Sequence, residues 1–256
     1  MDFVVIIPAR LASTRLPNKV LHAIAGEPML AHVCRAARAS GATEVIVATD
    51  SEAVAEAARV AGVTACMTRA DHSCGTDRIA EVAAQRGWAD DTIVVNVQAD
   101  EPLMPPALID QVATALDSDT EAAMATACTP IRDADAFNNP NIVKVVATPA
   151  GRALYFSRAP IPFHRDSSNT EFEACAFRHL GIYAYHAGAL KRFSAAPPGA
   201  LERIESLEQL RAFELNLPIA LVEARTVPGP GVDTPDDIAL VEALMAGGHS
   251  AERDND

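Results

Sequence analysis

The chain has 256 residues and a formal net charge of −13, with 49% apolar and 21% charged residues. This length suits one large α/β domain or one domain with a sizeable insertion, and the apolar fraction is enough for a substantial core. The acidic balance argues against general binding to nucleic acid or to anionic membranes. No stretch approaches the roughly 18 apolar residues of a membrane-spanning helix, and the first residues do not form a signal peptide. We therefore expect a cytoplasmic protein without membrane insertion.

The cysteines are odd in number and scattered, and none of them forms a CxxC pair. This usage fits a reducing compartment better than a disulfide framework. We expect these side chains to act as small buried apolar groups rather than as nucleophiles.

The first half of the chain alternates strand and helix patterns. A helix is expected to begin near Pro28, since proline suits a first helical turn. Repeated βα units predict a mostly parallel sheet covered by helices on both faces, a three-layer sandwich. The expected strands cover 3–7, 44–50, 64–68, 92–98 and 122–129, and the other expected helices cover 51–61, 77–86 and 105–116.

After Pro130 the pattern changes. Strand signals joined by a tight turn predict an antiparallel insertion over about 130–190, and residues 165–174 predict a polar loop. An apolar stripe at Leu201, Ile204, Leu207 and Leu210 predicts a helix that faces the core. We thus expect one domain over 1–246 and a disordered tail over 247–256. The expected elements of this half are strands at 141–147, 153–157, 178–185 and 219–223 and a last helix at 235–246.

The loop after the first strand concentrates positive charge in an acidic chain. It holds Arg10, Arg15 and Lys19, with Ser13 and Thr14 among them. Ligands of α/β sheets bind at the carboxyl ends of strands, so this loop favours a polyanion, and we predict a nucleoside triphosphate. Neither a GxGxxG nor a P-loop motif is present, which argues against an NAD-dependent oxidoreductase. The alternative is a solvated basic loop.

Two acids accompany this loop. Asp100 follows the expected strand 92–98 and therefore projects from the same sheet edge, and Asp233 precedes the last helix. Carboxylates suit Mg²⁺, which takes one or two of them together with phosphate oxygens. Either acid alone is equally explained as a helix cap, but two acids facing a cationic loop predict a metal–phosphate site.

Seven ordered segments resemble the 3-deoxy-manno-octulosonate cytidylyltransferase (CMP-Kdo synthetase) family. The first segment alone would also admit relatives that activate sialic acid. The segments are IPARLASTRLPNK (7–19), TRADHSCGTDR (68–78), VNVQADEP (95–102), LYFSRAPIP (154–162), RHLGIYAY (178–185), LEQLR (207–211) and PGPGVDTPDD (228–237).

The resemblance implies a Rossmann-like nucleotidyltransferase fold whose antiparallel insertion forms a homodimer. It implies transfer of CMP from CTP to 3-deoxy-D-manno-octulosonate (Kdo), with release of pyrophosphate, for lipopolysaccharide biosynthesis. Two alternatives stay open. In the first alternative, the enzyme transfers CMP to 8-amino-Kdo or sialic acid instead of Kdo. In the second, the chain is a module that senses CTP without turnover.

The resemblance also assigns residues by position. It places Mg²⁺ on Asp100 and Asp233, and it makes Arg10, Lys19 and Asp100 catalytic. Ala99 stands where the family usually has glycine, and its Cβ would restrict the backbone if φ were positive. The implied CTP-binding residues are Arg10, Ser13, Arg15, Lys19, Arg69, Cys74, Gly75 and Arg78, and the implied sugar-binding residues are Gln98, Arg158, His179, Tyr183, Glu208 and Gln209.

Overall fold

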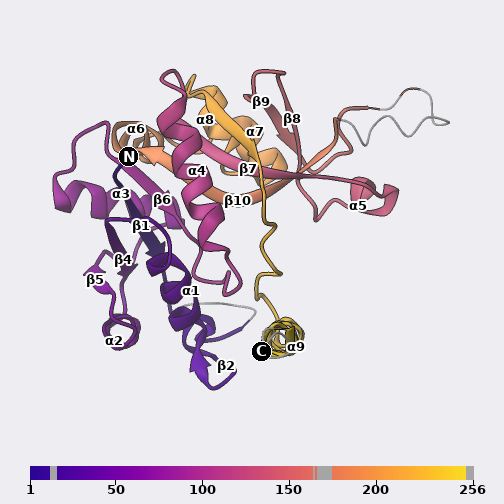
Figure 1. Ribbon diagram of the computed structural model, residues 1–256. Helices are drawn as coiled ribbons and strands as arrows, with labels where there is room; N and C mark the ends of the chain where they lie inside the picture. The colour runs from indigo at the N-terminus through magenta and orange to yellow at the C-terminus, as the bar shows by residue number, and fades with distance from the viewer. Residues whose placement is uncertain (12–15, 164, 166–174, 252–256) are drawn as a thin grey trace. The chain divides into compact units, whose positions relative to one another are not determined.

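The computed structural model describes residues 1–11, 16–163, 165 and 175–251 (Figure 1). The chain forms two compact units, which we describe separately. The terminal unit comprises Asp2–Gly87, Asn96–Asp110 and Thr226–Asp256, and the central unit comprises Met1, Trp88–Val95 and Gln111–Arg225. The expected insertion, about 130–190, lies within the central unit, whereas the domain boundaries themselves stay a prediction.

The terminal unit contains three parallel strands in the order β1-β4-β5. Ile6 pairs with Ile46, and β1 is almost wholly buried, as a near-continuous apolar strand of a covered parallel sheet should be. Its elements are β1 (Phe3–Pro8), η1 (Lys19–Leu21), β2 (Ala23–Ile24), β3 (Glu27–Pro28), α1 (Met29–Arg38), β4 (Glu44–Thr49), α2 (Glu52–Val60), β5 (Thr64–Met67), α3 (Gly75–Arg86) and α9 (Pro235–Ala251).

The central unit contains strands in the order β11-β7-β10-β6, with the hairpin β8–β9 joined to β10. β11 is parallel to β7, and β10 is antiparallel to it. Its elements are β6 (Ile93–Asn96) and α4 (Pro106–Ser118), through which the chain passes from one unit to the other, β7 (Met124–Pro130), α5 (Ala134–Asn138), β8 (Lys144–Ala147), β9 (Ala153–Ser157), β10 (Phe177–His186), α6 (Ala187–Ala195), α7 (Ala200–Glu205), α8 (Leu210–Glu214) and β11 (Ile219–Glu223).

The expected α/β class with a mostly parallel sheet and an antiparallel insertion is confirmed. The predicted core-facing helix at Leu201–Leu210 is wrong, because the chain leaves the helix at Ser206, which adopts a φ of 53°. Leu201 and Ile204 on α7 are 39% and 81% exposed, so only the second half of the stripe faces the core.

Other differences lie at short elements and at the chain end. The β2–β3 hairpin, α5 and α6 were not expected, and α9 runs to Ala251, beyond its expected end at 246. Residues 252–256 and most of the expected loop 165–174 lie outside the described residues. No helix among the described residues has both the length and the apolar composition required to cross a membrane.

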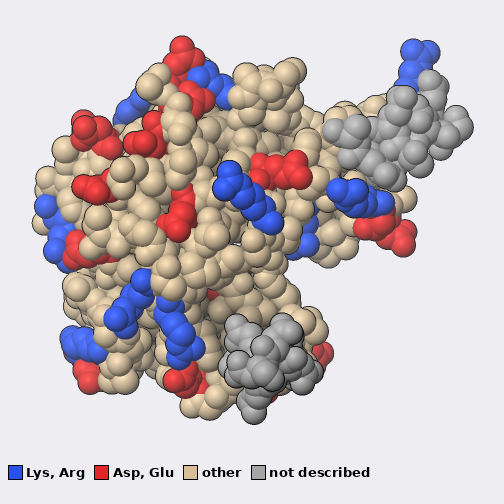
Figure 2. Space-filling view, in the orientation of Figure 1, with Lys and Arg blue, Asp and Glu red and all other residues tan. Residues whose placement is uncertain are grey.

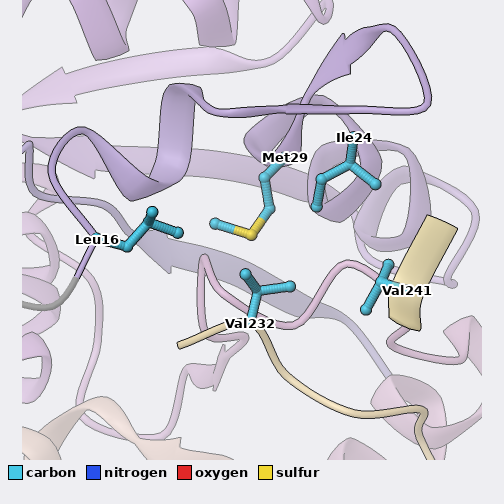
Figure 3. Packing of buried hydrophobic residues seen from close by; sticks show 5 residues of the cluster. All are labelled: Leu16, Ile24, Met29, Val232 and Val241. Atoms are coloured by element: carbon cyan, nitrogen blue, oxygen red, sulfur yellow. The ribbon is translucent and has the colours of Figure 1, made fainter. Parts of the chain in front are cut away.

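An apolar cluster joins distant segments of the terminal unit. Figure 3 shows Leu16, Ile24, Met29, Val232 and Val241 with their side chains turned toward one another, and each of them is at most 6% exposed. Burying one such side chain contributes about 1.5–3 kcal/mol. The cluster therefore fixes the segments just before Lys19 and just before Asp233.

Candidate active site

Lys19 is held at the start of η1. The preceding Asn18 adopts the left-handed conformation with φ 56°, which asparagine tolerates better than most residues. Leu16 and Val20 on either side are buried. The side chain of Lys19 is only 13% exposed, so the alternative of a solvated basic loop is wrong at this position.

Asp100 lies in a turn that closes when the amide of Glu101 donates to the carbonyl of Gln98 at 3.2 Å. The carbonyl of Asp100 accepts from the amide of Val232 at 2.9 Å. A Cβ on Gly231 would lie 3.3 Å from that carbonyl oxygen, so glycine permits the close approach of the two segments. The backbone itself thus brings the segment of Asp233 to that of Asp100.

Ala99 fits this turn without strain. The non-glycine residues with positive φ among the described residues are Asn18, Ala25, Ser206 and Asn216. Ala99 is not one of them, and its side chain is buried, with 5% exposure. The departure from glycine therefore does not disturb the backbone before Asp100.

Asp233 is presented by a turn that Asp237 closes. One carboxylate oxygen of Asp237 accepts from the amides of Asp233 and Thr234, at 2.9 and 2.7 Å, and from the Thr234 hydroxyl at 2.8 Å. These hydrogen bonds, that of Asp233 first, lower the pKa of Asp237. The carboxylate also stands at the start of α9, where a negative charge is favourable.

Lys19 joins the two acids. Its Nζ donates to Oδ2 of Asp100 at 2.6 Å and to Oδ1 of Asp233 at 2.9 Å. Burial opposes the charge on Lys19, but the hydrogen bonds and charges of the two carboxylates outweigh it and raise its pKa. The two carboxylates thus converge on one cationic centre, as expected from the sequence, whereas their role toward a metal stays a prediction.

The other residues of the first loop are less fully described. Arg10 is exposed just after β1. Ser13 and Arg15 lie outside the described residues. Figure 2 shows basic and acidic side chains interspersed over the face in view.

The start of α3 lies against the end of β1. A Cβ on Gly75 would stand 3.2 Å from Cγ of Pro8, so glycine lets the helix begin beside the strand end. Arg78, with its side chain 4% exposed, donates to Asp50 at 3.2 Å and to the hydroxyl of Thr68. Its guanidinium therefore braces β4 and the segment after β5 within the terminal unit.

Cys74 and Arg69 complete the expected nucleotide side. Cys74 is the N-cap residue of α3 and is partly exposed. The side chain of Arg69 is 68% exposed, with its Nε 3.3 Å from Oδ1 of Asp71. Cys74 thus stands directly before the helix start, whereas the amide of Arg69 donates to Glu81, farther along α3, at 3.0 Å.

The expected sugar-binding residues are divided between the units: Gln98 belongs to the terminal unit and the other five to the central unit. Arg158 follows β9. Its guanidinium donates to the carbonyls of Glu205 and Pro140 at 2.9 and 3.1 Å and, more weakly, of Ser206 at 3.5 Å. Within the part of the chain that the structure describes, backbone carbonyls rather than an ion pair therefore fix the position of the Arg158 side chain.

His179 and Tyr183 lie together on β10, with ring centroids 5.3 Å apart. Burial lowers the pKa of His179 to about 3, so its ring is neutral at physiological pH. Tyr183 is 8% exposed, and its Oη meets no hydrogen-bond partner among the described residues. Burial first, with the charges of Tyr185 and Glu208, raises the pKa of Tyr183 well above its usual value.

Glu208 and Gln209 stand just before α8. Glu208 is partly exposed and its charge acts on Tyr183, while Gln209 is 8% exposed. Within the central unit, Tyr183 therefore contacts the ring of His179 and lies near the charge of Glu208.

Sequence reasoning missed two groups beside these residues. Lys144 is fully buried, and its Nζ donates to the carbonyls of Asn139, Ile142 and Arg158 at 2.6–2.8 Å. Glu205 accepts from the hydroxyl of Ser157 at 2.6 Å and from the amide of Arg158 at 3.0 Å. Lys144 could have been found from the sequence, because a lysine inside an apolar strand pattern is unusual. Glu205 had no comparable signal in the sequence.

A family model described as cytidylyltransferase matches residues 4–219. The chain belongs to the cytidylyltransferase family. It is 51% identical over 249 residues to the 3-deoxy-manno-octulosonate cytidylyltransferase of Thioalkalivibrio sulfidiphilus (strain HL-EbGR7), covering 96% of this chain and 99% of that relative. This confirms the resemblance drawn from the seven segments.

Solved structures agree with this family membership. The structure of CMP:2-keto-3-deoxy-manno-octonic acid synthetase complexed with CTP has a TM-score of 0.89 and 41% identity, covering 97% of this chain and all of that one (100%). A 4-diphosphocytidyl-2C-methyl-D-erythritol synthase has a TM-score of 0.64 at 13% identity, covering 96% of this chain and 100% of that one, which is a likeness of fold alone. The cytidylyltransferase fold therefore extends over both units of the chain.

Proposed function

We propose that this cytidylyltransferase transfers CMP from CTP to Kdo and releases pyrophosphate, as a cytoplasmic step of lipopolysaccharide biosynthesis. The relative that is 51% identical is a 3-deoxy-manno-octulosonate cytidylyltransferase, and the similarity covers 99% of its length. The observation in the structure that carries the proposal is the convergence of Asp100 and Asp233 on Lys19. A phosphoryl-transfer site needs such a compact arrangement of acids and a cation.

Asp100 and Asp233 would hold Mg²⁺. The donor set fits, because one oxygen of each carboxylate already lies within 2.9 Å of a single ammonium nitrogen, so both can reach one cation. Two carboxylates plus substrate phosphates are ordinary ligands for this ion. When bound, Mg²⁺ would neutralise charge on the phosphates of CTP.

The reaction joins two anions. The oxygen of the anomeric hydroxyl of Kdo attacks the α-phosphorus of CTP in line and forms a new P–O bond, and its proton is lost to solvent. The bond between the α-phosphorus and the bridging oxygen breaks, and pyrophosphate leaves with the electron pair. Lys19 and Arg10 would contact the phosphates and reduce the repulsion between the substrates. Positioning and electrostatics suffice here, and no covalent enzyme intermediate is needed.

The remaining residues would select the substrates. Arg158 would pair with the sugar carboxylate. We assign cytidine recognition to Arg69, Cys74, Gly75 and Arg78, further phosphate contacts to Ser13 and Arg15, and the sugar acid to Gln98, His179, Tyr183, Glu208 and Gln209.

We also propose that the chain forms a homodimer through the central unit. Exposed apolar side chains support this, since Leu154, Phe163 and Ile204 are 57%, 85% and 81% exposed. Large apolar side chains left in water favour association with a second surface.

Pyrophosphate release with CTP, Mg²⁺ and Kdo tests the proposed reaction. UTP replaces CTP, and sialic acid or 8-amino-Kdo replaces Kdo, in parallel assays. Release that needs both CTP and Kdo supports the proposal. Faster release with either other sugar would transfer the proposal to that acceptor, and binding of CTP without release with any of the sugars would favour a CTP-sensing module.

A further inference from the structure

Thr126 lies on β7 with no exposed surface, and its hydroxyl meets three polar groups. Its Oγ1 is 2.7 Å from the carbonyl oxygen of Ile182, 3.2 Å from that of Leu180 and 3.0 Å from Nε2 of His179. A hydroxyl has one proton to donate and two lone pairs that accept.

This geometry assigns the protons. Both carbonyl oxygens only accept, so the single hydroxyl proton points to them and chiefly to Ile182, the closer one. If the proton pointed to His179 instead, oxygen lone pairs would face each other across 2.7 Å. Nε2 of His179 must therefore carry a hydrogen and donate it to Thr126, and in a neutral ring Nδ1 is then an acceptor.

An irregularity in β10 builds this contact. The register with β7 passes from Leu180 opposite Ala127 directly to Tyr183 opposite Thr126, so Gly181 and Ile182 have no partner on β7. Such a bulge turns the backbone of one strand locally. Here it brings the carbonyls of residues 180 and 182 to the same hydroxyl.

We propose that Thr126 is a positioning residue that locks His179 in its Nε2–H tautomer, so that Nδ1 accepts a hydrogen bond from a hydroxyl of the acid sugar. This rests on the proposed function, in which His179 contacts the sugar. The low pKa of His179 agrees with a neutral ring, which has no charge to pair with the sugar carboxylate.

The tautomer is measured directly by ¹⁵N NMR of the histidine rings in the free protein at neutral pH, with His179→Gln used to assign the signals. We expect His179 to show a protonated Nε2 and an unprotonated Nδ1. A protonated Nδ1 with a bare Nε2, or a doubly protonated ring, overturns the proposal. This readout does not depend on turnover, so an enzyme inactive on Kdo would sink the proposed function and leave the tautomer to be judged separately.

The kinetic arm uses Thr126→Val, which keeps the shape and removes the hydroxyl, and Thr126→Ser, which restores it. We expect the valine variant to raise the KM for Kdo about tenfold, the value of one hydrogen bond, with the KM for CTP unchanged. The serine variant should return the KM for Kdo to near the original and keep the original tautomer. Equal effects on both substrates, or no rescue by serine, would show a merely structural role for Thr126.

Discussion

Lys19 and Lys144 are both largely removed from solvent, yet their pKa values shift in opposite directions. Burial opposes the charge on each, but Lys19 faces two carboxylates and its pKa rises. Among the described residues, Lys144 donates its hydrogen bonds to carbonyl oxygens; burial first, and the charge of Arg158, lower its pKa more than the charge of Glu205 raises it. Carbonyl dipoles satisfy the donors of an ammonium without supplying a countercharge. Lys19, whose charged form the two carboxylates stabilise, is therefore better suited than Lys144 to contact phosphates.

Asp233→Asn should reduce turnover about 100-fold, because a neutral amide is a poor ligand for Mg²⁺ and a weaker partner for Lys19. Pyrophosphate release measures the loss. Asp236→Asn is the matched control, since Asp236 is exposed at the same helix start. This substitution removes the same charge as Asp233→Asn. Equal activity of the Asp233 variant and the control would rule out a role for Asp233 in the reaction.

His179 should make the folded protein sensitive to mild acid. Its pKa is about 3 when folded because the ring is buried, whereas it is near 6.5 when unfolded. As pH falls below the unfolded value, only the unfolded chain takes up the proton, so stability is lost. Relative to His179→Gln, the wild type should lose about 2 kcal/mol of unfolding free energy between about pH 8 and about pH 5. Denaturant titrations at both pH values check this, and parallel losses in the two proteins would contradict it.

At the scale of elements, the turn before α9 connects helix capping with the site. Asp237→Ala removes the acceptor for the amides of Asp233 and Thr234. We expect a loss of about 1 kcal/mol of stability, as for other lost helix caps. Turnover should fall more than this small destabilisation explains, because Asp233 loses its fixed orientation. Thermal melts and pyrophosphate release on the same samples separate the two effects, and unchanged turnover would show that the turn does not position Asp233.

Much of the fold could be predicted, because strands such as β1 and β4 can be recognised from their local apolar runs alone. The helix stripe from Leu201 to Leu210 misled, because periodicity does not reveal the break at Ser206. The convergence of Asp100 and Asp233 was expected mainly from the family resemblance, because a position after a strand or before a helix fits a helix cap equally well. The role of Thr126 could not be predicted, since its partners come from a bulge in a distant strand. Gly181 hints at that bulge, but the sequence does not say which side chain the bulge would meet.

At the scale of the whole molecule, association should depend on α7. Ile204→Glu places a charge on a side chain that is 81% exposed and should convert the proposed dimer to a monomer. Light scattering after size-exclusion chromatography measures the mass. Val60→Glu on α2, where the valine is 80% exposed, is the matched control and should stay dimeric. A dimer that survives the Ile204 substitution would place the interface elsewhere.

The ammonium between the two acids has a practical consequence for the protein without metal. Two carboxylates facing each other would repel, but the chain supplies its own counter-ion from residue 19. The proposed Mg²⁺ would then replace the ammonium of Lys19 between two carboxylates that are already in place before the metal binds. Prolonged dialysis against a chelator should accordingly abolish turnover while the melting temperature stays where it was, and added Mg²⁺ should restore turnover without refolding.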